Sequence, residues 1–316
     1  MEASFLTNPG CSYFLDGSPK ARRPVIPIYS TMSIFRPNLT AGTTAFVLIC
    51  FGGVLFAGGV PFNAEHGLVE VTVTIDNRVT GRFGIDTGAD GVYLDREFAI
   101  ENDLVTTTGQ PTLRVTGISG ASAGRSVTLG SFEFGDERLM NLEATIIDFD
   151  SLSPGNAGES PDGLIGYDLL RRMYLTIDYP ARQLEASFTR PDFLIRGDLP
   201  QVPFKLYNHM IIVEVTLRDG TTQPMILDYG ASVTAISPEV AGGIGLDGSS
   251  GEIQSAGRMS LDDLIVTDDV MVAVTDLSRY SGAIPGFSVE GILGASFLYA
   301  HKITINYRKN EIYLHG

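Results

Sequence analysis

The stretch Phe83-Gly84-Ile85-Asp86-Thr87-Gly88-Ala89 decides how this chain is interpreted, because it occurs twice. The second copy reads Ile226-Leu227-Asp228-Tyr229-Gly230-Ala231. In each copy an apolar run typical of a strand carries an Asp into a turn, where a Gly permits conformations closed to other residues and a small Ala leaves space. We therefore predict that two strands deliver Asp86 and Asp228 to equivalent loops.

The repetition extends well beyond the Asp motifs. Three further segments recur in the same order: Ser-Ala-Gly-Arg at 122–125 and 255–258, Gly-Leu-Ile-Gly at 163–166 with Gly-Ile-Leu-Gly at 291–294, and Tyr-Leu-Thr-Ile-Asp-Tyr at 174–179 with His-Lys-Ile-Thr-Ile-Asn-Tyr at 301–307. Four matches in one order indicate an internal duplication. We predict one lobe at 64–190, a linker rich in Pro and Gly at 191–202, and a second lobe at 203–316.

The hydrophobic pattern from residue 67 onward has a period of two. Apolar and polar residues alternate at 68–75, 127–134, 210–217 and 302–307, and β-branched and aromatic residues dominate these runs. Such runs, separated by short turn segments, predict strands. Helical windows are short and lie at 95–102, 168–172 and 238–241. The chain is therefore predicted to be all-β with small helices.

Composition excludes several classes of function. The 316 residues carry a net charge of −15, which disfavours a nucleic-acid partner, and Cys11 and Cys50 are too few for a disulfide framework or a thiolate metal cluster. Four histidines, His66, His209, His301 and His315, lack the pair spacing of a metal site on a helix. Gly-Ile-Gly-Leu-Asp-Gly at 243–248 has the glycine spacing of a dinucleotide site but follows a helical window, so we discard it. We expect neither a metal nor a cofactor.

The N-terminal segment 1–62 differs from the rest of the chain. It carries a small positive charge and an apolar block at 45–57 that is followed by small residues. This arrangement predicts a signal peptide cut after Gly59, with Met32 as an alternative start, or a membrane anchor at about 41–62. The protein is accordingly expected to be exported, either periplasmic or secreted, or held at a membrane by this segment.

Two carboxyl groups brought face to face can carry out hydrolysis. They cannot both ionise at low cost, so they share one proton. The ionised carboxylate can then take a proton from water, while the protonated carboxyl polarises a carbonyl group. A pair formed by Asp86 and Asp228 would therefore hydrolyse a peptide bond with an activated water.

The paired Asp motifs, each followed much later by two apolar residues and a Gly, resemble those of the retropepsin-like and pepsin-like aspartic proteases. The resemblance covers 67–316. It implies a bilobal acid-protease fold, with two β-barrel lobes related by a pseudo-twofold axis. It also implies an aspartic endopeptidase that needs no cofactor, acts on peptides or proteins and works as a monomer.

The same resemblance assigns supporting roles. Around the catalytic Asp86 and Asp228 it places Thr87, Gly88, Gly166, Tyr229, Gly230 and Gly294. The family closes a hairpin flap over its substrate, and chain order places flaps at 116–125 and 254–258. The flap and substrate-binding residues are expected to be Gly117, Ile118, Ser119, Gly120, Ser122, Gly124, Ser255 and Gly257.

Tyr229 departs from the family pattern, which has Thr or Ser after the Asp. That hydroxyl bonds across to the opposite loop, and a phenol cannot form the same short bond. Tyr229 must therefore point elsewhere or push the loops apart. Two alternatives stay open on this basis: an inactive peptide-binding module, and a homodimer that pairs Asp86 with its counterpart in a second chain.

Overall fold

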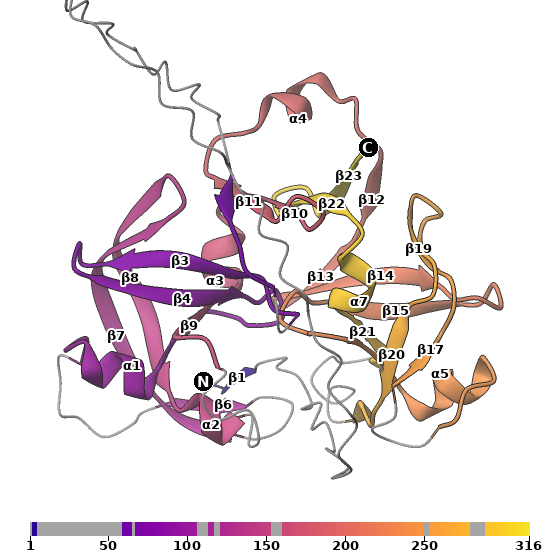
Figure 1. Cartoon of the computed structure of the whole chain (residues 1–316), viewed down its shortest axis with the longest axis horizontal. Coiled ribbons are helices and arrows are strands. Elements are labelled where there is room, and N and C mark those ends of the chain that lie inside the picture. Colours follow the sequence, from indigo (N-terminus) through magenta and orange to yellow (C-terminus); the bar gives the residue numbers. More distant parts are fainter. Residues whose placement is uncertain are drawn as a thin grey trace, which may run out of the picture. The chain divides into compact units, whose positions relative to one another are not determined.

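The computed structural model describes residues 2–4, 59–64, 67–105, 113–116, 121–152, 160–248, 253–278 and 288–316. These residues form three sheets with a few short helices, and the predicted bilobal all-β fold is confirmed (Figure 1). The predicted apolar block at 45–57, Met32 and most of the segment 1–62 lie outside the described residues. Within the described part of the chain, no helix has the length and apolar character needed to cross a membrane.

The first lobe is a closed barrel. Its strands are β3 (Glu70–Ile75), β4 (Val79–Ile85), β5 (Val92–Asp95), β7 (Ala121–Phe134), β8 (Glu137–Ile147) and β9 (Gly163–Ile165). The barrel closes because β7 pairs with both β3 and β8. At its rim β6 (Leu113–Thr116) forms a hairpin with β7, and β1 (Glu2–Ser4) pairs with β6. The helices are α1 (Arg96–Glu101), α2 (Phe149–Leu152) and α3 (Tyr167–Leu170).

The second lobe repeats this strand connectivity around a more open sheet. Its strands are β13 (Lys205–Tyr207), β14 (Met210–Thr216), β15 (Thr222–Leu227), β16 (Thr234–Ile236), β17 (Ile253–Ser255), β18 (Met259–Leu261), β19 (Ile265–Thr267), β20 (Met271–Val274) and β21 (Gly291–Leu293). The helices are α5 (Pro238–Gly243) and α7 (Ala295–Leu298). In both lobes the strand that leads to the Asp runs parallel to the strand of the later apolar-Gly motif.

A six-stranded sheet joins the two halves. It contains β2 (Val60–Pro61), β10 (Tyr174–Asp178), β11 (Gln183–Ser187), β12 (Gln201–Pro203), β22 (Lys302–Asn306) and β23 (Glu311–His315). The repeated segments at 174–179 and 301–307 form its central pair, β10 and β22, where the hydroxyls of Thr176 and Thr304 lie 2.6 Å apart. The predicted linker 191–202 contains α4 (Asp192–Arg196) and the start of β12.

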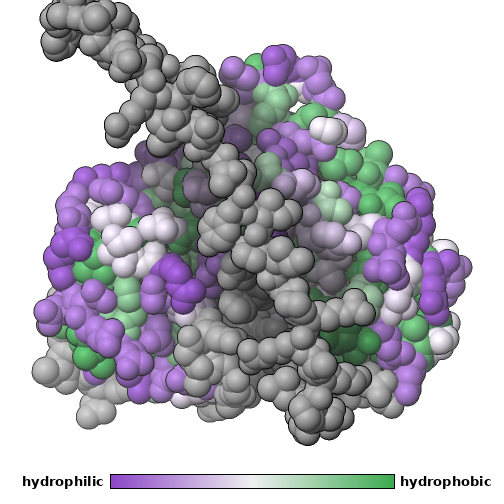
Figure 2. Space-filling model, in the orientation of Figure 1, coloured by the Kyte–Doolittle hydropathy of each residue, from purple (hydrophilic) through white to green (hydrophobic). Residues whose placement is uncertain are grey.

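Side-chain alternation explains why these strands pack as they do. In β3, Val71, Val73 and Ile75 are buried in the core, whereas Thr72 between them is exposed. One face of β3 therefore builds the apolar interior, and the other lies toward solvent. Hydrophilic side chains accordingly cover much of the described surface that Figure 2 shows.

Candidate functional site

The two Asp loops begin at equivalent strand ends. The backbone N–H of Asp86, just after β4, donates to the carbonyl of Ile165 in β9 at 3.0 Å. The backbone N–H of Asp228, just after β15, donates to the carbonyl of Leu293 in β21, also at 3.0 Å. Each Asp is thus fixed by the parallel strand that carries the second half of its sequence motif.

Gly166 and Gly294 each lie against the neighbouring Asp loop. A Cβ atom on Gly166 would stand 2.4 Å from the carbonyl oxygen of Gly91, and one on Gly294 would stand 2.6 Å from that of Val233. No side chain fits at such distances, so both positions require glycine for close approach of the backbone. This is the placement that the family resemblance implies for both glycines.

Backbone N–H groups hold one oxygen of each carboxyl. Asp86 Oδ1 accepts hydrogen bonds from the N–H groups of Gly88 and Ala89, both at 2.9 Å. Asp228 Oδ1 accepts from Gly230 at 2.8 Å and from Gly88 at 3.1 Å. The N–H of Gly88 therefore reaches both carboxyl groups, which brings the two sequence-predicted catalytic residues together in one site.

The second oxygen of each carboxyl has a different environment. Asp86 Oδ2 and Asp228 Oδ2 are buried and have no hydrogen-bond donor among the described residues. The opposite loop packs directly on the first carboxyl, since a Cβ on Gly230 would lie 2.5 Å from Asp86 Cγ. One oxygen of each carboxyl is therefore fixed by backbone N–H groups, and the second oxygen of each is not.

Burial makes it costly to ionise both groups. It raises the pKa of Asp86 well above its usual range, and the charge of Asp228 raises it further, against the opposing N–H groups of Gly88 and Ala89. Burial also raises the pKa of Asp228. A proton on Asp86 can hydrogen-bond to Asp228, so the two groups titrate as a coupled pair.

Thr87 ties the first loop to the second. Its Oγ1 donates to the carbonyl of Leu227 at 3.0 Å and accepts from the N–H of Tyr229, also at 3.0 Å. All of these atoms are buried, where a hydrogen bond is less weakened by solvent. Thr87 thus makes the cross-loop contact that the family pattern implies.

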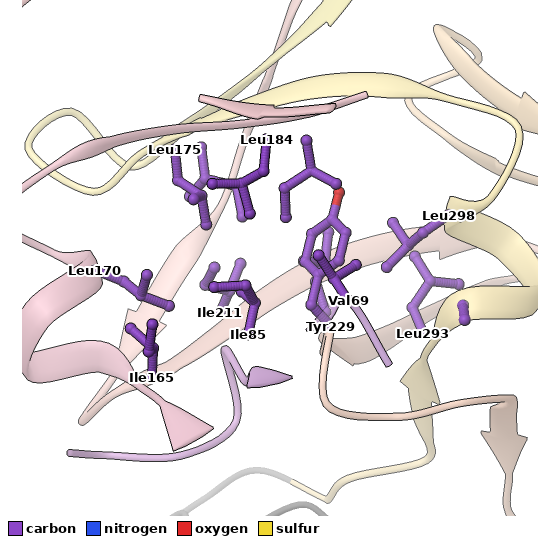
Figure 3. Close-up of a cluster of buried hydrophobic side chains, with 14 of the residues drawn as sticks. Val69, Ile85, Ile165, Leu170, Leu175, Leu184, Ile211, Tyr229, Leu293 and Leu298 are labelled. Atoms are coloured by element: carbon purple, nitrogen blue, oxygen red, sulfur yellow. The ribbon is translucent and has the colours of Figure 1, made fainter. Parts of the chain in front are cut away.

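Tyr229 does not make the reciprocal contact with its side chain. The ring is fully buried and stacks on Tyr179 with ring centroids 6.0 Å apart and an interplanar angle of 13°. Figure 3 shows the ring among apolar side chains, including Val69, Leu184 and Leu298. Of the two placements left open by the sequence, Tyr229 therefore adopts the first: it points away from the carboxyl pair into the core.

Two tyrosine hydroxyls lie unpartnered beneath the site. The hydroxyls of Tyr229 and Tyr307 are buried and find no partner in the described part of the chain, whereas that of Tyr179 donates to the carbonyl of Gly67 at 3.4 Å. Burial raises the pKa of all three phenols. Sequence reasoning did not select Tyr179 and Tyr307, although each ends one of the repeated strands.

The predicted flap residues are only partly described. Four of them lie outside the described residues: Gly117, Ile118, Ser119 and Gly120. Ser122 and Gly124 lie in β7, where the Ser122 hydroxyl is buried and accepts from the N–H of Asp148 at 3.1 Å. That hydroxyl thus supports the base of the hairpin, and its contact with substrate stays a prediction.

The second predicted flap is a turn held against its own lobe. The Ser255 hydroxyl donates to the Asp269 carboxylate and accepts from the N–H of Gly257 at 3.2 Å. The carbonyl of Gly257 accepts from the N–H of Val270 at 2.9 Å. Ser255 and Gly257 are thus engaged by the segment before β20, and their role toward substrate is likewise untested.

Sequence reasoning set aside one residue that the fold brings to the site. His209 lies at the turn between β13 and β14, and its side chain is buried beside the first Asp loop. The sequence offers only an indirect indication of this residue: His209 stands in the second copy at the position that Gly67 takes in the first. Among the described residues, no cluster of His, Cys, Asp and Glu is arranged to hold a metal ion.

Comparison with known proteins bears on the first half of the chain. A comparison with curated proteins found no match. Residues 71–169 match the family model described as aspartyl protease, and this segment includes Asp86, Thr87 and Gly166. Over residues 71–169 the chain is therefore similar to aspartyl proteases, in agreement with the resemblance of its Asp motifs to the retropepsin-like proteases.

Proposed function

We propose that the chain is an aspartic endopeptidase whose Asp86 and Asp228 act as one catalytic pair. The observation that carries this proposal is the convergence of the two buried carboxyls on the N–H of Gly88, with an unpartnered Oδ2 on each. The second half thereby supplies the carboxyl that the matched domain needs. A structural pair of aspartates would be expected to have partners for all four oxygens.

The pair divides the chemistry between its two protonation states. The ionised carboxylate takes a proton from the attacking water, and the protonated carboxyl polarises the scissile carbonyl. The water oxygen bonds to the carbonyl carbon, the C–N bond then breaks, and the leaving nitrogen takes up a proton from the pair. Oδ1 of each Asp stays bound to backbone N–H groups, so the geometry need not reorganise during the reaction.

The substrate is proposed to be an extended segment of a peptide or protein. Hairpin β6–β7 at the rim of the first lobe offers backbone groups at the place where the family closes a flap over substrate. An extended chain can add as a further strand to the outer edge of β6, where β1 pairs in this structure and would have to give way. We propose that a monomer is sufficient, because Asp228 occupies the place that Asp86 of a second chain would take in the homodimer alternative.

Cleavage of a peptide library by the full chain, followed by mass spectrometry from pH 3 to 8, tests the proposal. Wild type, Asp86→Asn and Asp228→Asn are compared, and solution mass is measured against the 34.0 kDa of one chain. Loss of cleavage in both variants of an active monomer is the expected result. Loss in Asp86→Asn alone, with an active dimer, would favour the homodimer. A folded wild type that cleaves no peptide would favour the alternative of an inactive peptide-binding module.

We also propose that the protein is exported and that its signal is removed after Gly59. Cleavage there would leave Val60 and Pro61 at the new N-terminus, where β2 pairs with β11 in the joining sheet. The mass of the protein recovered from the exported fraction tests this directly. A mass that includes residues before Gly59 would instead favour the membrane anchor.

A further inference from the structure

The hairpin of β6 and β7 extends beyond the rim of the first barrel. β7 pairs with β8 from Arg125 onward, whereas its residues 121–124 pair with β6. β6 is therefore held on one side by β7, and its other side is not part of the barrel. An edge with unpaired N–H and C=O groups readily accepts another strand, so the segment that covers this edge matters.

The first residues of the chain cover the outer edge of β6. β1 runs parallel to β6 and lies beside it in Figure 1. The register pairs Ala3 with Val115 and extends over all three residues of β1. Within the described part of the chain, β6 thus has a strand on both sides, and the contact with β1 is made by the main chain.

β1 occupies the position that we propose for substrate. An extended peptide would add to β6 through the N–H and C=O groups that point away from β7. One edge of a strand can take only one neighbouring strand at a time. A substrate strand and β1 therefore exclude each other at residues 114–116, whatever the side chains of the substrate are.

We propose that β1 is an intramolecular inhibitor, because it closes the edge of β6 to an incoming peptide. The proposal rests on the proposed function for its effect on cleavage, whereas the pairing of β1 with β6 is independent of that function. Competition for the edge raises KM. It leaves kcat unchanged, because a substrate that is bound has already displaced β1.

Covalent connection makes so short a strand effective. As part of the same chain, β1 keeps its local concentration near β6 when the protein is diluted, whereas a free peptide does not. Cleavage after Gly59, which we propose for export, would separate β1 from the lobes. One cut would then both remove the N-terminal segment and open the edge of β6 to substrate.

The size of the inhibition depends on how often β1 leaves the edge. With β1 docked in about nine molecules of ten, only a tenth of the molecules can bind substrate, which raises the apparent KM about tenfold. Because the contact is made by the main chain, the inhibition should depend on the N–H groups of β1 and not on its side chains. This requirement separates an inhibitory strand from a segment that merely lies nearby.

Paired substitutions in the full chain test the pairing. Successive N–H groups of a strand point to opposite sides, so Ala3→Pro/Ser4→Pro removes an N–H that faces β6 in either phase. The matched control, Ala3→Ser/Ser4→Ala, exchanges the two side chains and keeps both N–H groups. Hydrogen exchange of the β6 amides that point away from β7 should become about tenfold faster in the proline variant and stay at the wild-type rate in the control. Both variants should fold, since β1 pairs with β6 and with no other described strand.

Two further measurements follow the effect on substrate. For the library peptide that is cleaved fastest, KM should fall about fivefold to tenfold in the proline variant, with kcat within about twofold of wild type. Retention of the same library by immobilised protein in the Asp86→Asn background measures binding without cleavage. At low peptide concentration, the proline substitutions should increase the retained peptide about tenfold.

Each outcome decides a different point. Equal exchange in wild type, the proline variant and the control would show that β1 does not pair with β6 in solution, and would overturn the proposal. Faster exchange with unchanged KM and retention, or no peptide retained by any variant, would also overturn it, because peptide would then not bind at this edge. A protein that retains peptide as expected but never cleaves it would support the inhibition and refute the proposed function.

Discussion

Replacing Tyr229 separates the role of its ring from the role of its hydroxyl. In Tyr229→Phe the ring remains stacked on Tyr179, and the group removed is a buried hydroxyl without a partner in the described structure. Leaving such a hydroxyl desolvated costs about 1 kcal/mol or more. The variant should therefore be more stable than wild type by about 1 kcal/mol, or by roughly 1–2 °C in Tm for a protein of this size.

Tyr229→Thr restores the residue of the family pattern at the cost of the ring. Tyr229 is 0% exposed, and losing a buried aromatic side chain typically costs about 3–5 kcal/mol. A new cross-loop hydrogen bond from Thr would return about 1 kcal/mol. The family residue should thus destabilise this protein by about 2–4 kcal/mol, because the surrounding core is built around a tyrosine.

Thermal and urea unfolding at pH 7 measure both changes, and peptide cleavage measures their effect on the site. Tyr307→Phe, which also removes an unpartnered buried hydroxyl, is the matched control and should be equally well tolerated. Because the Tyr229 side chain points away from the carboxyl pair, Tyr229→Phe should keep kcat/KM within about twofold. The placement of the ring would be refuted if Tyr229→Phe lowered the free energy of unfolding by about 1 kcal/mol. It would also be refuted if Tyr229→Thr were as stable as wild type.

Three further predictions concern the loops themselves. Thr87→Val removes two buried hydrogen bonds and should lower the free energy of unfolding by about 2–4 kcal/mol, whereas Thr87→Ser should stay near wild type in urea unfolding. Because the folded pKa values of Asp86 and Asp228 are raised, their contribution to stability is lost as pH rises, so either Asp→Asn variant should gain stability over wild type at pH 8 and lose that gain near pH 3. Gly166→Ala should destabilise by about 3 kcal/mol or more because its Cβ meets backbone at 2.4 Å, and Gly242→Ala, which meets nothing within 4 Å, should unfold like wild type or slightly later.

The sequence was sufficient to predict the parts of the structure that depend on local pattern. Period-two alternation located the strands, and the recurrence of the Asp and apolar-Gly motifs placed Asp86 and Asp228 on equivalent loops. Gly166 and Gly294 could be assigned to the same loops because close backbone approach demands a residue without a side chain. These features are determined by residues near one another in the chain or by the repeat.

Features that depend on contacts across the lobes could not be predicted. The direction of the Tyr229 ring is determined by the joining sheet, where Tyr179 provides a stacking surface from a different strand pair. The burial of His209 carries no local signal, since it depends on how the turn between β13 and β14 packs. The joining sheet was also not predicted, since β10 of the first half pairs there with β22 of the second.

The internal duplication that the repeated motifs predict would explain how the Asp loops tolerate a tyrosine. Thr87 both donates to the Leu227 carbonyl and accepts from the Tyr229 N–H, so one hydroxyl makes both cross-loop bonds. In a homodimer the residue after the Asp is the same on both sides, and a tyrosine there would remove both hydroxyls at once. Two copies in one chain can diverge, so that one copy keeps the threonine and the other gives its position to the core.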